Sequence, residues 1–279
     1  MSNSDVAAHF SKKEIISDFL DSYSLETDDR TSLFIKYRKN LIVQQVRKHY
    51  KNARILEIGC GIGDLTIELA SLGYDCTAMD ISEEMIEMAR KKTPDQLKGK
   101  IEYYVGDLAK LPNADAYDVI IANGVIPYFK DKKSFLDALS SQLHKAGKVF
   151  IIHRNALFNF YALNEGTLEL FKNHFSDFDE SLSTRLGEVI PDLTKKKESF
   201  TNTHLYRSEE VPYEIGDLYR QSDFDVLDII ACCIHSKPPR IDDSTSQQIT
   251  DAHNKYQSDW RGLFVGSQFL VVAEKNVSV

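Results

Sequence analysis

Residues 55–66 read ILEIGCGIGDLT, an apolar run that meets three glycines at every second position and continues into a helical pattern. Glycine adopts a positive φ without strain and lets the backbone approach a ligand closely. The run therefore predicts a strand, a tight turn and the start of a helix. In an open α/β sheet, ligands bind at the carboxyl ends of the strands, so we expect a binding site at this turn.

The chain around this turn alternates apolar segments with helical ones. The strand candidates are residues 53–58, 74–79, 101–105, 117–122 and 148–153, and the helix candidates between them are residues 64–72, 83–92 and 131–145. Near-continuous apolar strands separated by helices are typical of a parallel sheet that is covered on both faces.

The alternation stops after His153. Residues 154–207 are rich in aromatics and hold no strong strand, residues 209–221 predict a helix, and residues 224–235 and 264–273 predict two strands separated by a polar stretch. We expect an α/β fold with a doubly wound, mostly parallel seven-stranded sheet, an antiparallel edge strand, N-terminal helices and a mainly helical lid inserted after the fifth strand. The expected parts are a helical cap (1–50), the ligand-binding core (51–153), a lid and acceptor insertion (154–222) and a closing strand pair (223–279).

The composition narrows the classes of function. The net charge of −8 argues against a broad nucleic-acid surface, because phosphate binding requires clustered Lys and Arg. The charged first 22 residues do not resemble a signal peptide, and no apolar run approaches the ~18 residues of a membrane helix. The four cysteines form no C-x-x-C pair, which indicates neither zinc nor a disulfide framework. We expect a cytoplasmic protein with reduced thiols and no membrane partner.

Acidic residues flank the glycines and select the ligand. Gly59, Gly61 and Gly63 have G-x-G-x-G spacing rather than the G-x-G-x-x-G of dinucleotide binders, and Glu57 and Asp64 lie on either side. A pyrophosphate would be repelled by two carboxylates, whereas a ligand with an ammonium and a sulfonium group would be attracted. This charge argument favours S-adenosylmethionine over NAD. A plain turn for the glycines, and an orienting role without ligand contact for Glu57, are the alternatives.

Two further acids follow the next strands. Asp80 lies about 20 residues beyond the glycines, the interval at which an acid meets ribose hydroxyls, and Ile81 beside it could cover adenine. Asp107 could accept a hydrogen bond from the adenine amino group, and the Leu108 N–H could donate to the ring. The alternatives are a helix cap for Asp80 and an Asx turn for Asp107.

Four motifs in order resemble class I S-adenosylmethionine-dependent methyltransferases. They are ILEIGCGIGDLT (55–66), the acid in AMDIS (78–82), the GD of VGDLAKLP (105–112) and the run YDVIIANGVIPYF (117–129). The resemblance covers residues 50–153 and, less closely, the closing strand pair. It implies that the glycine loop passes the methionine portion, that Asp80 holds ribose and that Asp107 holds adenine. Asn123 and Gly124 would then lie near the methyl group.

Other residues are candidates for the cofactor carboxylate and the acceptor. Tyr37 and Arg38 could fold over the cofactor and hold its carboxylate, with an exposed helix surface as the alternative. The acceptor-side candidates are Tyr128 and His153 as catalytic groups, and Arg154, His204 and Tyr206 as acceptor-binding groups. The alternatives are packing for Tyr128, a buried hydrogen-bonded histidine for His153, a solvated salt bridge for Arg154 and structural roles for the others.

The resulting functional prediction is methyl transfer from S-adenosylmethionine to a small molecule. No metal-ligand pattern is present, so we expect metal-independent in-line displacement that depends mostly on positioning. The pattern after His153 resembles methyltransferases of surface-sugar biosynthesis, which suggests a sugar or nucleotide-linked hydroxyl or amine. The alternatives are an NAD(P)-dependent oxidoreductase and a non-catalytic subunit that binds S-adenosylmethionine and supports a partner.

Overall fold

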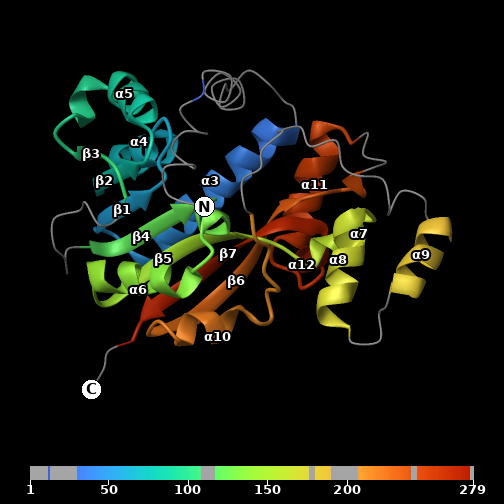
Figure 1. Ribbon diagram of the computed structural model, residues 1–279. Helices are drawn as coiled ribbons and strands as arrows, with labels where there is room; N and C mark the ends of the chain where they lie inside the picture. The colour runs from blue at the N-terminus through green and yellow to red at the C-terminus, as the bar shows by residue number, and fades with distance from the viewer. Residues whose placement is uncertain are drawn as a thin grey trace.

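A seven-stranded sheet forms the centre of the computed structural model, which describes residues 12, 30–107, 117–175, 180–189, 207–239 and 244–276. The strand order is β3-β2-β1-β4-β5-β7-β6 (Figure 1). The strands are β1 (Arg54–Ile58), β2 (Asp75–Asp80), β3 (Ile101–Val105), β4 (Tyr117–Asn123), β5 (Leu143–Arg154), β6 (Phe224–Ile234) and β7 (Gly266–Lys275).

Strand directions confirm the expected fold class. β1 to β5 are parallel, and β7 pairs antiparallel with both β5 and the edge strand β6. The antiparallel strand thus lies one position inside the edge. As a consequence, the carboxyl ends of β1 to β6 and the amino end of β7 share one edge of the sheet.

Helices cover both faces of the sheet (Figure 1). One face is covered by α3 (Arg30–His49), α4 (Asp64–Ser71) and α5 (Glu83–Lys92), and the other by α6 (Lys132–Gln142) and α10 (Ile215–Arg220). Two short 3₁₀ helices, η1 (Asp95–Leu97) and η3 (Ile126–Tyr128), lie between these elements. The doubly wound arrangement follows from strands that are apolar on both sides.

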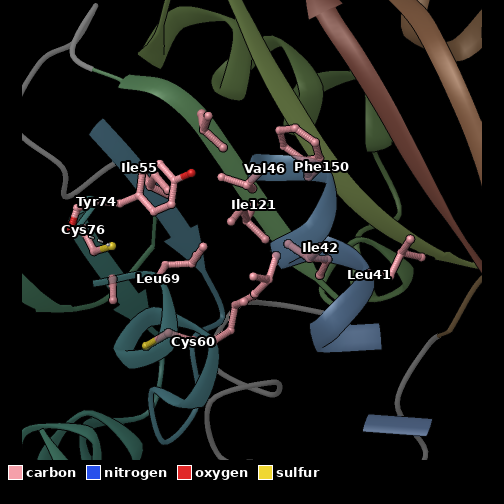
Figure 2. Packing of buried hydrophobic residues seen from close by; sticks show 14 of the residues in the cluster. Leu41, Ile42, Val46, Ile55, Cys60, Leu69, Tyr74, Cys76, Ile121 and Phe150 are labelled. Atoms are coloured by element: carbon pink, nitrogen blue, oxygen red, sulfur yellow. Dashed lines mark hydrogen bonds between the residues drawn. The ribbon is translucent and has the colours of Figure 1, made fainter. Parts of the chain in front are cut away.

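The N-terminal helix α3 is built into the core. Leu41, Ile42 and Val46 of α3 belong to the same buried cluster as Ile121 of β4 and Phe150 of β5, and Figure 2 shows Val46 close to the last two. Each of these side chains is at most 3% exposed, so the helix is held by a fully buried apolar stripe. The described helix of the cap that was expected over residues 1–50 therefore contributes directly to the central core.

The described part of the insertion after β5 is mainly helical, as expected. It holds α7 (Phe158–Ala162), α8 (Glu165–His174) and α9 (Glu180–Val189). The helix expected at 209–221 is shorter, since α10 begins at Ile215. Glu210 instead forms a parallel bridge with Asn155, beside the end of β5. The four-part division of the chain stays a prediction.

The polar stretch between β6 and β7 contains α11 (Ser246–Tyr256) and α12 (Gly262–Val265), which the sequence analysis missed. Thr245 caps α11, and its reciprocal hydrogen bonds with Gln248 form a capping box. α11 packs against α3 and β6. In the part of the chain that the structure describes, no helix is both long and apolar enough to cross a bilayer.

Candidate functional site

The glycine turn between β1 and α4 has the predicted geometry. Gly59, Gly61 and Gly63 have φ angles of 69°, 52° and 81°, in the region that favours glycine. The backbone N–H groups of Gly59 and Cys60 donate to the Met79 carbonyl at 2.8 and 3.0 Å. These bonds hold the turn against the end of β2.

Two of these glycines serve different purposes. A Cβ at Gly59 would lie 2.3 Å from Cγ2 of Val125, so the turn packs directly on the segment after β4. A Cβ at Gly61 would meet no atom of the described residues within 4 Å. The backbone of Gly61 therefore borders open space in which a ligand could approach it closely.

Asp80 joins the glycine turn to α5. Its Oδ2 accepts from the Gly61 N–H and its Oδ1 from the Ser82 N–H, both at 2.9 Å. The cap of α5 is Ser82, whose hydroxyl accepts from the Met85 N–H. Burial raises the pKa of Asp80, while these backbone hydrogen bonds oppose the increase. Because a carboxylate accepts about four hydrogen bonds, Asp80 retains capacity for ribose hydroxyls.

The end of β3 lies beside the same turn. The Gly106 N–H donates to the Asp80 carbonyl at 2.8 Å, so Asp107 follows directly at the shared edge. Asp107 and Ile81 are both half-buried. Leu108 lies outside the described residues. The predicted adenine and ribose residues that are described thus gather at the ends of β2 and β3.

Glu57 lies beneath the turn, 3% exposed, and accepts a hydrogen bond from the Thr66 hydroxyl of α4. Burial raises its pKa to about 8, with further contributions from Asp64 and Asp80. Glu57 is therefore mostly protonated at neutral pH. Asp64 is paired with Lys92 Nζ at 2.5 Å, so the attraction for a cation falls mainly to Asp80. This burial favours the alternative in which Glu57 supports the loop without contacting ligand.

Arg38 of α3 reaches the carboxyl end of β4. Its Nη1 donates to Gln268 Oε1 at 3.0 Å and lies 3.7 Å from the place of a Cβ at Gly124. Arg38 Nε and Asn123 Oδ1 are both buried, and neither has a hydrogen-bond partner among the described residues. The end of β4 thus holds one unsatisfied donor and one unsatisfied acceptor, which is the pattern that a polar ligand completes.

Tyr37 has different neighbours from those of Arg38. Its ring stacks on His253 of α11 with centroids 3.9 Å apart, and its hydroxyl donates to Thr250 at 2.6 Å. These contacts anchor α3 to α11. A cofactor contact of Tyr37 stays a prediction that these contacts do not support.

His153 is enclosed at the opposite face of the sheet. The imidazole is 0% exposed, its Nδ1 lies 3.1 Å from Glu210 Oε2, and its Nε2 lies 2.9 Å from the Tyr219 hydroxyl. The ring also stacks on Phe269. Burial alone would raise the pKa of Glu210, but the hydrogen bond with His153 and the nearby charge of Lys132 lower this pKa to about 2. Because both ring nitrogens are engaged, the geometry favours the buried-histidine alternative over a catalytic base.

The two other acceptor-side candidates that the structure describes, Arg154 and Tyr128, also contact protein side chains. Arg154 donates from Nε and Nη2 to Oε1 of Glu209 at 3.3 and 3.0 Å, as in the salt-bridge alternative. The Arg207 guanidinium lies 5.6 Å from the centre of the Tyr128 ring. His204 and Tyr206 lie outside the described residues. The acceptor assignments stay predictions.

Sequence reasoning missed Gln268, Glu209 and Glu210. The two glutamates act on β5 from across the lid insertion, and no spacing rule connects such distant positions. One feature of the sequence could have indicated Gln268, which is a polar side chain inside the mostly apolar run 264–273. Its partner Arg38 is 230 positions away, so only the fold identifies the pair.

Residues 49–210 match the family described as a methyltransferase domain. A magnesium-protoporphyrin O-methyltransferase of Rhodobacter capsulatus is 36% identical over 95 residues, which cover 33% of this chain and 42% of that protein. A ubiquinone biosynthesis O-methyltransferase of Pelagibacter ubique is 30% identical over 132 residues, 46% of this chain and 55% of the relative. A malonyl-[acyl-carrier protein] O-methyltransferase of Priestia megaterium is 33% identical over 112 residues, 39% and 40% of the two chains.

A solved structure agrees with the fold over nearly the whole chain. Magnesium protoporphyrin IX methyltransferase from Synechocystis PCC 6803, crystallised with bound S-adenosylhomocysteine, superimposes with a TM-score of 0.61 at 15% identity, covering 99% of this chain and 100% of that one. The chain spans about half the length of the curated relatives that it matches. The family match covers residues 49–210, more than half of the sequence, and includes the glycine turn, Asp80 and Asp107. The chain therefore belongs to the methyltransferase domain family.

Proposed function

We propose that this protein transfers a methyl group from S-adenosylmethionine to an oxygen atom of a small molecule. The observation that carries the proposal is the glycine turn, which is open at Gly61 and tied to Asp80 at 2.9 Å. Family membership supports the reaction type, and the three relatives described above, all named O-methyltransferases, favour oxygen over nitrogen as the acceptor atom. A sugar or nucleotide-linked hydroxyl is the acceptor class that we propose.

The residues present fit the cofactor. Asp80 would accept hydrogen bonds from the ribose and Asp107 from the adenine amino group. Arg38 would bind the carboxylate, and Asn123 would accept from the ammonium group. The cofactor supplies a methyl group on a positively charged sulfur, which leaves readily. The chain then has to orient the two reactants and exclude water, and such positioning supplies several kcal/mol of catalysis, up to about 7–11 in favourable cases.

A nicotinamide-dependent oxidoreductase is the competing function. Its pyrophosphate would have to lie against a turn that is bonded to the Asp80 carboxylate, since Asp64 on the other side is already paired with Lys92. Isothermal titration with S-adenosylhomocysteine and with NADH separates the two functions. We expect binding of S-adenosylhomocysteine, and binding of NADH alone would reverse the assignment.

Substitution of Asp80 tests the proposed ribose contact. Asp80→Asn should weaken S-adenosylhomocysteine binding by about 1.5–3 kcal/mol, because an amide has one oxygen acceptor where the carboxylate has two. Asp75→Asn, at the exposed opposite end of β2, is the matched control and should bind normally. Equal affinity of the folded Asp80 variant and the control would refute this role.

The remaining alternative is a non-catalytic subunit that binds the cofactor. Incubation with methyl-labelled S-adenosylmethionine and fractionated small-molecule extracts tests it. Labelled product is expected with the wild-type protein and should be strongly reduced with Asp80→Asn. Tight cofactor binding without labelled product in any extract would favour the non-catalytic alternative.

A further inference from the structure

Gln268 connects three elements at the edge where the strand ends meet. It lies near the start of β7, opposite Arg154 of β5 and Cys232 of β6. Its Oε1 accepts from Nη1 of Arg38 at 3.0 Å and from the Cys233 thiol at 3.6 Å. Only the oxygen of an amide can face a guanidinium N–H, so this contact fixes the orientation of the Gln268 side chain.

The bond to Gln268 decides which edge of Arg38 remains available. A guanidinium binds a carboxylate in two-point fashion through Nε and Nη2. This protein uses that edge elsewhere, since Arg261 donates from Nε and Nη2 to the two oxygens of Asp259 at 2.7 and 2.8 Å. In Arg38, Gln268 occupies Nη1, while the buried Nε has no hydrogen-bond partner among the described residues.

The Asn123 side chain supplies an acceptor beside Arg38, so the two residues together could bind a zwitterion. Asn123 Oδ1, at the end of β4, is also buried and lacks a hydrogen-bond partner within the described ranges. Gly124 follows Asn123, and the place of its Cβ is 3.7 Å from Arg38 Nη1, so the two unsatisfied groups lie at the same strand end. A donor that suits a carboxylate and an acceptor that suits an ammonium group together match an amino-acid head group.

We infer that Gln268 is a positioning residue that, by holding Nη1 of Arg38, presents the Nε edge to a carboxylate and makes the site selective for ligands with an amino-acid head group. The inference rests on the proposed function, whose cofactor carries such a group. It assigns part of cofactor selectivity to β7, far along the chain from the glycine turn. Cys233, with its φ of 52°, supports the same amide oxygen from β6.

Two probes isolate this role, S-adenosylhomocysteine and 5′-methylthioadenosine, which keeps the nucleoside but lacks the amino-acid head group. In Gln268→Leu we expect about tenfold weaker binding of S-adenosylhomocysteine and unchanged binding of 5′-methylthioadenosine. Arg38→Met should show a larger loss with the same selectivity. Because Gln268 acts through Arg38, the double variant should bind S-adenosylhomocysteine no more weakly than Arg38→Met.

Gln268→Glu provides a second, polar variant should the leucine disturb folding. Its carboxylate would pair with Arg38 and compete with the ligand carboxylate, so the same selective loss is expected. An equal loss for both probes, no loss, or additive losses in the double variant would overturn the inference. Failure of the wild-type protein to bind either probe would instead refute the proposed function, and equal wild-type affinity for both probes would exclude a head-group contact.

Discussion

At the scale of single residues, Glu57 combines an unusual ionisation with a structural position. Its carboxyl group lies under α4 and its pKa is raised to about 8, chiefly by burial, in spite of the Thr66 hydrogen bond. Between about pH 4.5 and pH 8, the folded protein therefore keeps a proton on Glu57 that the unfolded chain has already released. The contribution of Glu57 to the free energy of unfolding is therefore fully present below about pH 4.5 and is lost as the pH rises toward 8.

Glu57→Gln should remove this pH dependence. The amide can still accept from Thr66 but carries no charge, so its free energy of unfolding should change less between pH 6 and pH 8 than that of the wild type. The wild type should lose about 2 kcal/mol more over this interval. Denaturant unfolding at both pH values measures the difference, with the exposed Glu87→Gln as control. Parallel pH profiles of wild type and Glu57→Gln would contradict the raised pKa.

At the scale of elements, the turn between β1 and α4 contains two glycines with different roles: Gly59 packs against the protein, and Gly61 faces the proposed ligand. Gly59→Ala places a methyl group against Val125 at a positive φ and should destabilise the protein by about 3 kcal/mol. Gly61→Ala meets no described atom and should cost about 1 kcal/mol from its backbone conformation, yet its methyl group intrudes on the proposed ligand space. Denaturant unfolding and S-adenosylhomocysteine titration of both variants test this contrast. A larger affinity loss in folded Gly59→Ala than in Gly61→Ala would reverse the assignment.

The sequence predicted the elements whose signals are local. Apolar runs located all seven strands, and the glycine spacing located the turn after Ile58. The structure differs where long-range contacts override local pattern. Residues 209–211 do not join the expected helix, because Glu210 pairs with the end of β5. α11 was missed because its apolar residues are few, although Thr245 and Gln248 carried a capping signal.

The same distinction applies to the candidate site. Gly61 and Asp80 could be placed together from sequence, since both follow neighbouring strands of a parallel sheet, and a 2.9 Å hydrogen bond joins them. The face to which a strand-end side chain points depends on register and on covering helices. His153 therefore lay at the predicted edge but turned toward Tyr219 of α10, away from α3 and Arg38.

At the scale of the whole molecule, α3 links the proposed cofactor site to the C-terminal elements. Its Tyr37 stacks on His253 of α11, and its Arg38 bonds to Gln268 of β7. The apolar stripe of the helix packs in the buried cluster that contains residues of β4 and β5, as Figure 2 shows for Val46, Ile121 and Phe150. A ligand that engages Arg38 would therefore restrain segments that contain no glycine-turn residue.

This link predicts the pattern of hydrogen exchange on ligand binding. S-adenosylhomocysteine should slow exchange in the glycine turn and also in α11 and the first residues of β7, because fixing Arg38 suppresses local opening of the helix that holds them together. Exchange measured by mass spectrometry with and without ligand tests the pattern. Arg38→Met, at saturating ligand, should keep the protection of the turn and lose most of the protection at α11 and β7. Protection confined to residues 55–107 in the wild-type protein would show that α3 does not transmit binding to the C-terminal strand pair.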